Sequence, residues 1–284
     1  MRIFLVSSAV AGLALLVSGC SDKAPSQSAS PSASGAQDTR VPSAPDANAP
    51  SEAPSAEASE APPADLSVDV SNDTYEFQFA YPAKAAAIPG LRSWFETRRR
   101  TARKELEASA SQDKQAAAAQ DFPYHAHVYS ADWQVVTDLP EWLSLSSEIY
   151  TYTGGAHGMS SFDGRLWNRG TDAMLKAADL FTSEDAFSSA VRARFCKALD
   201  AQRVKRRGAA LVPGDIFSEC IEPARQTVLL GSSNGKTFDR IGFEIAPYEA
   251  GPYAEGSYEI TLPVDAAVMR ALKPQYRNSF SIPG

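Results

Sequence analysis

Residues 148–158 read EIYTYTGGAHG, and this short stretch decides how the surrounding chain folds. Residues 142–153, which lead into it, alternate between apolar and polar side chains as a half-buried strand does. Gly154 and Gly155 then supply the positive φ angles that a tight turn needs. Residues 160–168 return to strand character, so the sequence predicts a β-hairpin that turns within 154–158.

Strands and helices extend outward from this hairpin in both directions. A strand at 122–136 precedes it, joined by a turn at 138–141, and the predicted order is strands, helix, strands, helix. This order is typical of an α+β domain in which helices pack on an antiparallel sheet. The Asn234-Gly235 pair is the strongest local signal of a further hairpin. The other predicted elements are a strand at 66–80, helices at 91–119, 183–203, 216–220 and 265–272, and strands at 227–231, 239–246 and 256–262.

The N-terminus has the pattern of a bacterial lipoprotein signal. Met1 and Arg2 precede an apolar run of residues 3–17, which is shorter than the ~20 residues of a membrane-spanning helix. Residues 16–20, LVSGC, are similar to a lipobox, so 1–19 is the expected signal peptide and Cys20 the lipidated residue. An ordinary signal followed by a chance cysteine is the alternative. Two or more acyl chains anchor a protein stably, and Ser21 favours the periplasmic face of the outer membrane.

A segment with the composition of a disordered tether follows. Residues 21–64 consist almost entirely of Ala, Pro, Ser, Glu and Asp, with no aromatic residue and Val41 as the one large aliphatic. Such a chain cannot bury enough apolar surface to offset the entropy of ordering. We expect a passive spacer from Cys20 to residue 64, with a Pro-rich docking motif as the alternative. The globular domain is expected at 65–284, with halves at about 65–160 and 161–284.

The charge of the chain argues against nucleic acid as a partner. The formal net charge is −7, and both the tether and the domain are acidic. Nucleic-acid binding requires a clustered positive face. One basic cluster is present on the predicted helix, and it has two interpretations, a solvated helix face or a patch for an anionic glycan or lipid headgroup. It contains Arg98, Arg99, Arg100, Arg103 and Lys104.

Cys196 and Cys220 are expected to form a structural disulfide. Two cysteines in an oxidising compartment usually pair, and closing this loop of about 25 residues would stabilise the fold by roughly 3 kcal/mol. A redox pair is the alternative, but it would lack the Cys-x-x-Cys spacing. The loop contains a basic, flexible-looking run at 203–208.

Three histidines offer the one metal-site hypothesis. His125 and His127 would share a face of the predicted strand, and hairpin pairing would bring His125 opposite Gly154 and close to His157. Three imidazoles could hold Zn²⁺ with an open position, which makes a metal-dependent envelope enzyme the alternative function. Ser160 and Ser161 lack the strand–turn–helix context of a nucleophile elbow. The sequence shows no convincing catalytic set, so we expect neither an enzyme nor a cofactor.

Three motifs in order resemble one family. The EIYTYTGGAHG stretch, the DLF of residues 179–181 and FEIAPYEAG at 243–251 are similar to the extracellular domain of the anti-sigma factor RsiV. The same module stands beside the catalytic domain of the peptidoglycan deacetylase PdaC. The resemblance implies a sheet with helices packed on it. Function is implied only weakly: the RsiV member binds lysozyme, and in the deacetylase the module is an accessory.

Aromatic residues around two of these motifs form the candidate binding surface. Tyr150, Tyr152 and His157, presented by the Gly154-Gly155 turn, are amphipathic contacts of the kind enriched at interfaces. Tyr248 and Tyr253 belong to a second aromatic loop that could be part of the same surface. The competing interpretation is a tight turn in which His157 satisfies backbone groups. We therefore expect a membrane-anchored envelope lipoprotein with a non-catalytic domain that binds lysozyme or peptidoglycan.

Overall fold

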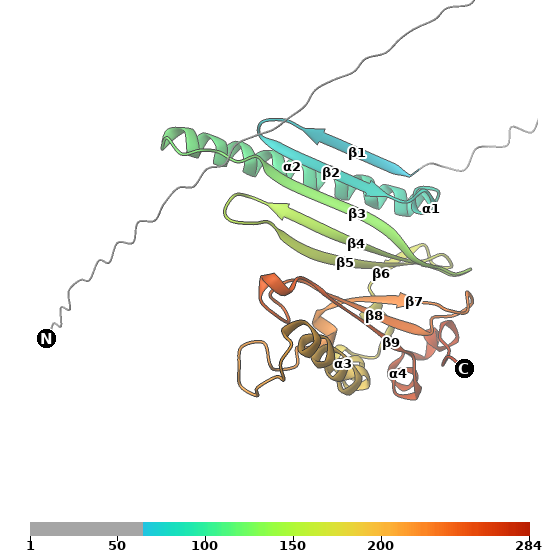
Figure 1. Cartoon of the computed structure of the whole chain (residues 1–284). Helices are drawn as coiled ribbons and strands as arrows, with labels where there is room; N and C mark the ends of the chain where they lie inside the picture. Colours follow the sequence, from blue (N-terminus) through green and yellow to red (C-terminus); the bar gives the residue numbers. More distant parts are fainter. Residues whose placement is uncertain (1–64) are drawn as a thin grey trace, which may run out of the picture. The chain divides into compact units, whose positions relative to one another are not determined.

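The computed structural model describes residues 65–284 (Figure 1). The predicted signal peptide, lipidated Cys20 and tether lie outside these described residues. Within 65–284, no helix combines the length and the apolar character needed to cross a membrane.

The larger of two sheets has six strands whose order follows the chain. All neighbouring strands are antiparallel except β2 and β3, which run parallel because helix α2 crosses between them. The predicted α+β class is confirmed, and this parallel pair is the departure from a purely antiparallel sheet. The strands are β1 (Leu66–Ser71), β2 (Tyr75–Tyr81), β3 (His127–Asp138), β4 (Trp142–Tyr152), β5 (Met159–Asn168) and β6 (Ala173–Leu175).

The single strand predicted at 66–80 is wrong, because a turn divides it into β1 and β2. The Asn72 side-chain oxygen accepts hydrogen bonds from the backbone N–H groups of Thr74 (2.8 Å) and Tyr75 (2.9 Å). A short polar side chain that bonds the backbone two or three residues on is a standard way to reverse a chain. The apolar alternation on both sides of the turn conceals it in the sequence.

Helix α2 (Pro89–Ala119) covers one face of the larger sheet (Figure 1), after the short α1 (Ala83–Ala86). Pro89 stands at the first helical position, where its missing N–H is no loss. Leu91, Phe95 and Leu106 lie on one stripe and are buried. They pack against the odd-numbered side chains of β2, β3 and β4, which include Phe77, Phe79, Trp133, Leu143 and Leu145.

The smaller sheet contains β7 (Thr227–Gly231), β8 (Arg240–Ile245) and β9 (Tyr258–Pro263), all antiparallel. Helix α3 (Glu184–Arg207) covers one face, with Phe187 and Phe195 against Phe243 of β8. As predicted, α3 begins after Ser183, whose hydroxyl accepts from Ala186 N (3.0 Å). The remaining helices are α4 (Ala266–Ala271) and the 3-10 turns η1 (Ala177–Leu180), η2 (Pro223–Arg225), η3 (Tyr253–Glu255) and η4 (Pro274–Ser279).

The helical piece predicted at 216–220 is absent, and this segment forms turns. Phe217 has φ 60°, a left-handed conformation that interrupts any right-handed helix. Ile216 is 84% exposed, so it also has no core to bury against.

Strand β7 of the smaller sheet lies against β5 of the larger one. The Thr227 hydroxyl donates to Phe162 O (2.9 Å). A Cβ at Gly164 would stand 2.8 Å from Leu229 Cδ2, so the glycine permits this close approach. The contact extends to β3 and β4, and the Ser232 N–H donates to Thr137 Oγ1 of β3 (3.0 Å). The smaller sheet therefore covers β5 and the adjoining parts of β3 and β4 on the face opposite α2.

Candidate functional site

The face of β1–β4 opposite α2, called here the open face, is polar and acidic. Because side chains alternate along a strand, the pairing registers place one set of residues on this face. Strands β1–β4 contain no lysine or arginine. The open face consists of Ser67, Asp69, Ser71, Glu76, Gln78, Ala80, Val128, Ser130, Asp132, Gln134, Ser146, Glu148, Tyr150 and Tyr152.

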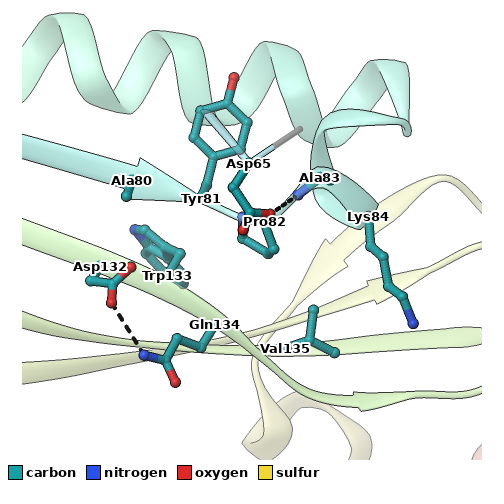
Figure 2. Close-up of a pocket in the computed structure, with 10 residues that line it drawn as sticks. All are labelled: Asp65, Ala80, Tyr81, Pro82, Ala83, Lys84, Asp132, Trp133, Gln134 and Val135. Atoms are coloured by element: carbon teal, nitrogen blue, oxygen red, sulfur yellow. Dashed lines mark hydrogen bonds between the residues drawn. The ribbon is translucent and has the colours of Figure 1, made fainter. Parts of the chain in front are cut away.

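Two hollows lie along the open face. The first, about 660 Å³, is lined by Asp132 and Gln134 and closed at one end by Pro82. Figure 2 shows the Gln134 amide donating to the Asp132 carboxylate (3.1 Å). Lys84 stands at the margin, where it pairs with Asp138 (2.8 Å). The second hollow, about 430 Å³, is lined by open-face residues that include Asp69, Glu76, Gln78 and Ser130.

Two pairs of carboxylates stand directly opposite each other on neighbouring strands. Asp132 of β3 faces Glu148 of β4, and Glu244 of β8 faces Glu259 of β9. Like charges in this arrangement destabilise a sheet. None of the four forms an ion pair with a lysine or arginine of residues 65–284.

Glu244 connects the smaller sheet electrostatically with the open face. Burial, and then the negative charges of Glu259 and Glu148, raise the pKa of Glu244 to about 7. One of its carboxylate oxygens is buried without a hydrogen-bond partner among the described residues. Glu148 of the larger sheet therefore helps to raise the pKa of Glu244 in the smaller sheet.

We expect the free energy of unfolding of the parent protein to fall as pH rises, and we expect Glu244→Gln to abolish this fall. Because the folded pKa of Glu244 is raised from 4.5 to about 7, the native state holds the proton in that window and the unfolded state releases it. The free energy of unfolding therefore falls as pH rises through the window. At pH 8 the variant should be more stable than the parent by about 1–2 kcal/mol, after allowance for solvent screening.

Urea unfolding at pH 4.5, 6 and 8 measures this difference. Glu105→Gln, on exposed α2 surface, is the matched control and should leave the pH profile unchanged. Parallel profiles for the parent and Glu244→Gln would contradict the expectation.

The two aromatic loops of the sequence meet in space. The ring of His157 stacks on that of Tyr253, with centroids 3.7 Å apart and 15° between the planes. His157 Nε2 lies 3.3 Å from the Tyr248 hydroxyl, and the Tyr248 and Tyr253 rings are 5.6 Å apart. We call His157, Tyr248 and Tyr253 the aromatic rim. Tyr248 is 47% exposed.

Glycines shape the hairpin side of the aromatic rim. Gly154 and Gly155 have φ angles of 100° and 90°, which side-chain-bearing residues rarely adopt. A Cβ at Gly158 would lie 2.3 Å from the Tyr150 ring and 2.6 Å from Thr151 O, so only glycine fits. Tyr152 donates to Gly155 O (3.1 Å), which ties the turn to β4.

Arginines of α3 hold the other side of the rim. Residues 203–207 of the run at 203–208, expected to be a flexible loop, form the last turn of α3, and Gly208 caps the helix with φ 67°. Fully buried Arg203 donates to Ala250 O (2.9 Å) and Glu219 O (3.0 Å). Two nitrogens of Arg207 bind the two oxygens of Glu255 (2.8 and 3.1 Å), which lowers the pKa of that carboxyl.

This arginine brace was missed by sequence reasoning, although a signal for it exists. Arg203, Arg206 and Arg207 are three and four residues apart, so they share one face of a helix. Arg206 lies over the Tyr258 ring, 3.8 Å from its centroid. The brace fixes the loop that carries Tyr248 and Tyr253, and Tyr248 holds a left-handed φ of 71° there.

The three histidines do not meet, so the proposed three-histidine zinc site is wrong. Strand β3 begins at His127, which leaves the exposed His125 in the preceding irregular segment. His127 is buried, with Nε2 3.3 Å from Asp113 Oδ2, and His157 belongs to the aromatic rim. No group of three His, Cys, Asp or Glu within 65–284 has the geometry to hold a metal ion.

Ser160 and Ser161 lie within β5, away from any strand-to-helix turn. Ser161 donates to Ile149 O at 3.5 Å, and Ser160 pairs with Tyr150 of β4.

Three of the five residues in the basic cluster on α2 are paired with carboxylates of the chain itself. Arg98 binds Asp163 (2.8 Å), and Arg99 binds Glu96 one turn earlier (2.5 Å). Arg103 binds Glu107 (2.9 Å). These contacts support the interpretation of a solvated helix face.

Cys196 of α3 and Cys220 are joined by a disulfide, with Sγ atoms 2.00 Å apart and Cα atoms 5.5 Å apart. The bond ties α3 to the segment whose Glu219 carbonyl accepts from Arg203.

The N-terminal part of the domain is similar in sequence to a known protein family. The sequence model of a family described as "Deacetylase PdaC" matches residues 68–160. This range contains most of β1, all of β2–β4 and α2, and the EIYTYTGGAHG motif. Residues 68–160 therefore carry a PdaC-type sequence, as the motif resemblance predicted. No curated protein matches the chain.

Two solved structures of the DUF3298 family are similar to the chain. One is a protein from Bacteroides fragilis with 18% identity and a TM-score of 0.44, covering 77% of this chain and 98% of that one. The other is from Pseudomonas aeruginosa PAO1, with 18% identity and a TM-score of 0.43, covering 78% of this chain and 95% of that one.

Proposed function

We propose that the domain is a non-catalytic binding module of the cell envelope, and that the aromatic rim is its contact surface for a protein partner. The observation that carries this proposal is the rim itself. Three aromatic rings from loops about 90 residues apart in sequence meet at the surface. Two of them, His157 and Tyr253, are stacked, and Tyr248 lies tilted beside them with one hydrogen bond to His157. Rigid aromatic groups with a polar end give large contact area at low entropic cost and dominate many interfaces.

The way the chain fixes the rim supports a binding role. The loop carrying Tyr248 and Tyr253 is held by charged hydrogen bonds from Arg203 and Arg207. On the other side, the Gly154-Gly155 turn and Gly158 hold His157 in place. Preorganised contact groups lose little conformational entropy on association, which strengthens binding.

The envelope location is part of the same proposal. Residues 16–20 are similar to a lipobox, and lipidation of Cys20 would anchor the domain to a membrane surface without a membrane span. Cys196 and Cys220 suit an oxidising compartment, where disulfides persist. Labelled palmitate incorporated by wild-type protein, and lost in Cys20→Ala, would test the anchor.

We expect Tyr253→Ala and Tyr248→Ala each to weaken partner binding about tenfold or more, because both remove stacked contact area at the rim. Calorimetric titration of the purified protein with a c-type lysozyme is the first measurement. Phe122→Ala is the matched control, since Phe122 is an aromatic residue 65% exposed outside the rim. It should leave the affinity unchanged.

The remaining outcomes separate the alternatives. Circular dichroism and urea unfolding should show that the rim variants stay folded. Binding of peptidoglycan fragments but not of lysozyme would make the partner a glycan. Binding of lysozyme that both rim variants leave unchanged would remove the aromatic rim as the contact surface.

A further inference from the structure

Part of the open face has no covering layer among the described residues, because the smaller sheet reaches only one side of it. Strand β7 covers β5 and the adjoining parts of β3 and β4, and α2 covers the opposite side of β1–β4. Glu76, Gln78, Asp132, Gln134 and Glu148 of the open face are exposed. Two hollows of about 660 and 430 Å³ on this face could receive side chains of a docked partner.

The four strands contribute charge of one sign to the open face, and Lys84 at the margin of the first hollow is paired with Asp138. The open face carries Asp69, Glu76, Asp132 and Glu148, and no base from β1–β4 balances them. Asp132 and Glu148 are cross-strand neighbours, an arrangement that costs the free protein stability. A positively charged partner would relieve this repulsion, and complementary charge gives an interface both specificity and a fast association rate.

Basic groups of the smaller sheet do not neutralise this face. Arg240, on the same side of β8 as Glu244, lies at the opposite end of the strand, across from Pro263. Its Nε is 3.9 Å from Asp239 Oδ1. The acidic tether of residues 21–64 carries the same sign as the open face and is a poor occupant for it.

We propose that the open face is the docking surface for a cationic protein segment, whose lysine and arginine side chains contact Asp69, Glu76, Asp132 and Glu148. This inference rests on the proposed binding function and deepens it by assigning the charge of the partner. The open face is continuous with the rim, because Tyr150 and Tyr152 follow Glu148 on the same side of β4 and Tyr150 packs under Gly158. One partner therefore contacts both surfaces.

A ten-residue lysine peptide, labelled for fluorescence anisotropy, is the probe. The full-length protein should bind it, and Asp132→Asn/Glu148→Gln should weaken binding about tenfold with a shallower salt dependence. Asp69→Asn/Glu76→Gln should act in the same direction. The matched control is Glu105→Gln/Glu141→Gln, which changes the net charge equally at exposed positions off the open face. It should change the affinity less than about twofold.

Stability measurements show whether a variant loses affinity because it unfolds or because it lacks the carboxylates. Removing the Asp132–Glu148 repulsion should leave the urea midpoint unchanged or raise it, so the variant remains folded while it binds less. An equal loss of affinity in the control and open-face variants would overturn the inference, because net charge alone would then explain the binding. No binding of the lysine peptide would overturn it as well.

The two proposals fail separately. Lysozyme binding that depends on Tyr253 but not on Asp132 and Glu148 would leave the aromatic rim in place and remove the open face. Lysozyme binding that depends on Asp132 and Glu148 but is indifferent to Tyr253→Ala and Tyr248→Ala would support the inference and remove the rim.

Discussion

Arg203→Met is expected to lower the free energy of unfolding by about 3–4 kcal/mol, the largest effect of any substitution considered for this chain. Arg203 is fully buried, and its guanidinium donates to the carbonyls of Ala250 and Glu219. Methionine fills a similar space but removes both donors. Ala250 O then keeps only the longer hydrogen bond from Arg207 Nη2 (3.3 Å), and Glu219 O loses the Arg203 donor. An unsatisfied buried acceptor costs about 1–3 kcal/mol, and hydrogen bonds from a charged group are the stronger kind.

Arg203→Met should weaken partner binding as well as lower stability. Ala250 belongs to the loop between Tyr248 and Tyr253, so loss of the Arg203 hydrogen bond, which leaves its carbonyl with only the longer bond from Arg207, should loosen the aromatic rim. We expect Arg203→Met to weaken partner binding even at low temperature, where most molecules remain folded. Urea unfolding and lysozyme titration on the same preparation measure both effects.

Lys205→Met is the matched control for Arg203→Met. Lys205 lies on the same turn of α3 and is exposed, so its replacement should change stability by no more than about 0.5 kcal/mol. Equal effects of the two substitutions would show that the buried hydrogen bonds of Arg203 do not hold the loop.

The paired substitution Cys196→Ala/Cys220→Ala is expected to lower the free energy of unfolding by about 3 kcal/mol. The disulfide spans a sequence separation of 24 residues, and its removal lets the unfolded chain sample more conformations. The folded state also loses the bond between α3 and the segment that contains Glu219. Urea unfolding of the oxidised parent and the variant measures the difference.

Dithiothreitol provides the control within the same experiment. Reductant should lower the stability of the parent towards that of the variant and leave the variant unchanged. A loss below about 1 kcal/mol would indicate that the unfolded chain is already restricted without the bond.

Local patterns were sufficient for most of the secondary structure. The sequence predicted helices at 91–119 and 183–203, which α2 and α3 match apart from their ends. Alternation and the Gly154-Gly155 pair predicted the hairpin of β4 and β5. The errors at 66–80 and 216–220 arose where one asparagine side chain or one left-handed residue reversed the chain. These details depend on few atoms and leave little trace in an apolar pattern.

Some residues of the candidate site could be predicted from the sequence, and others could not. Tyr150, Tyr152 and His157 could be selected from the motif, because a strand and its turn bring nearby residues together. The three-histidine hypothesis failed because it required strand β3 to begin two residues earlier than it does. The arginine brace was missed because a run of basic residues indicates a helix turn and a solvated loop equally well.

By itself, the sequence determined the element types, the hairpin turn and the spacing of the two cysteines, since each of these depends on residues close together in the chain. Only the tertiary structure decided that His157 meets Tyr248 and Tyr253, that β2 pairs in parallel with β3, and that acidic residues of four strands share one uncovered face. The physical reason is that these contacts join distant segments. Their geometry follows from how the two sheets and their helices pack, which no local pattern encodes.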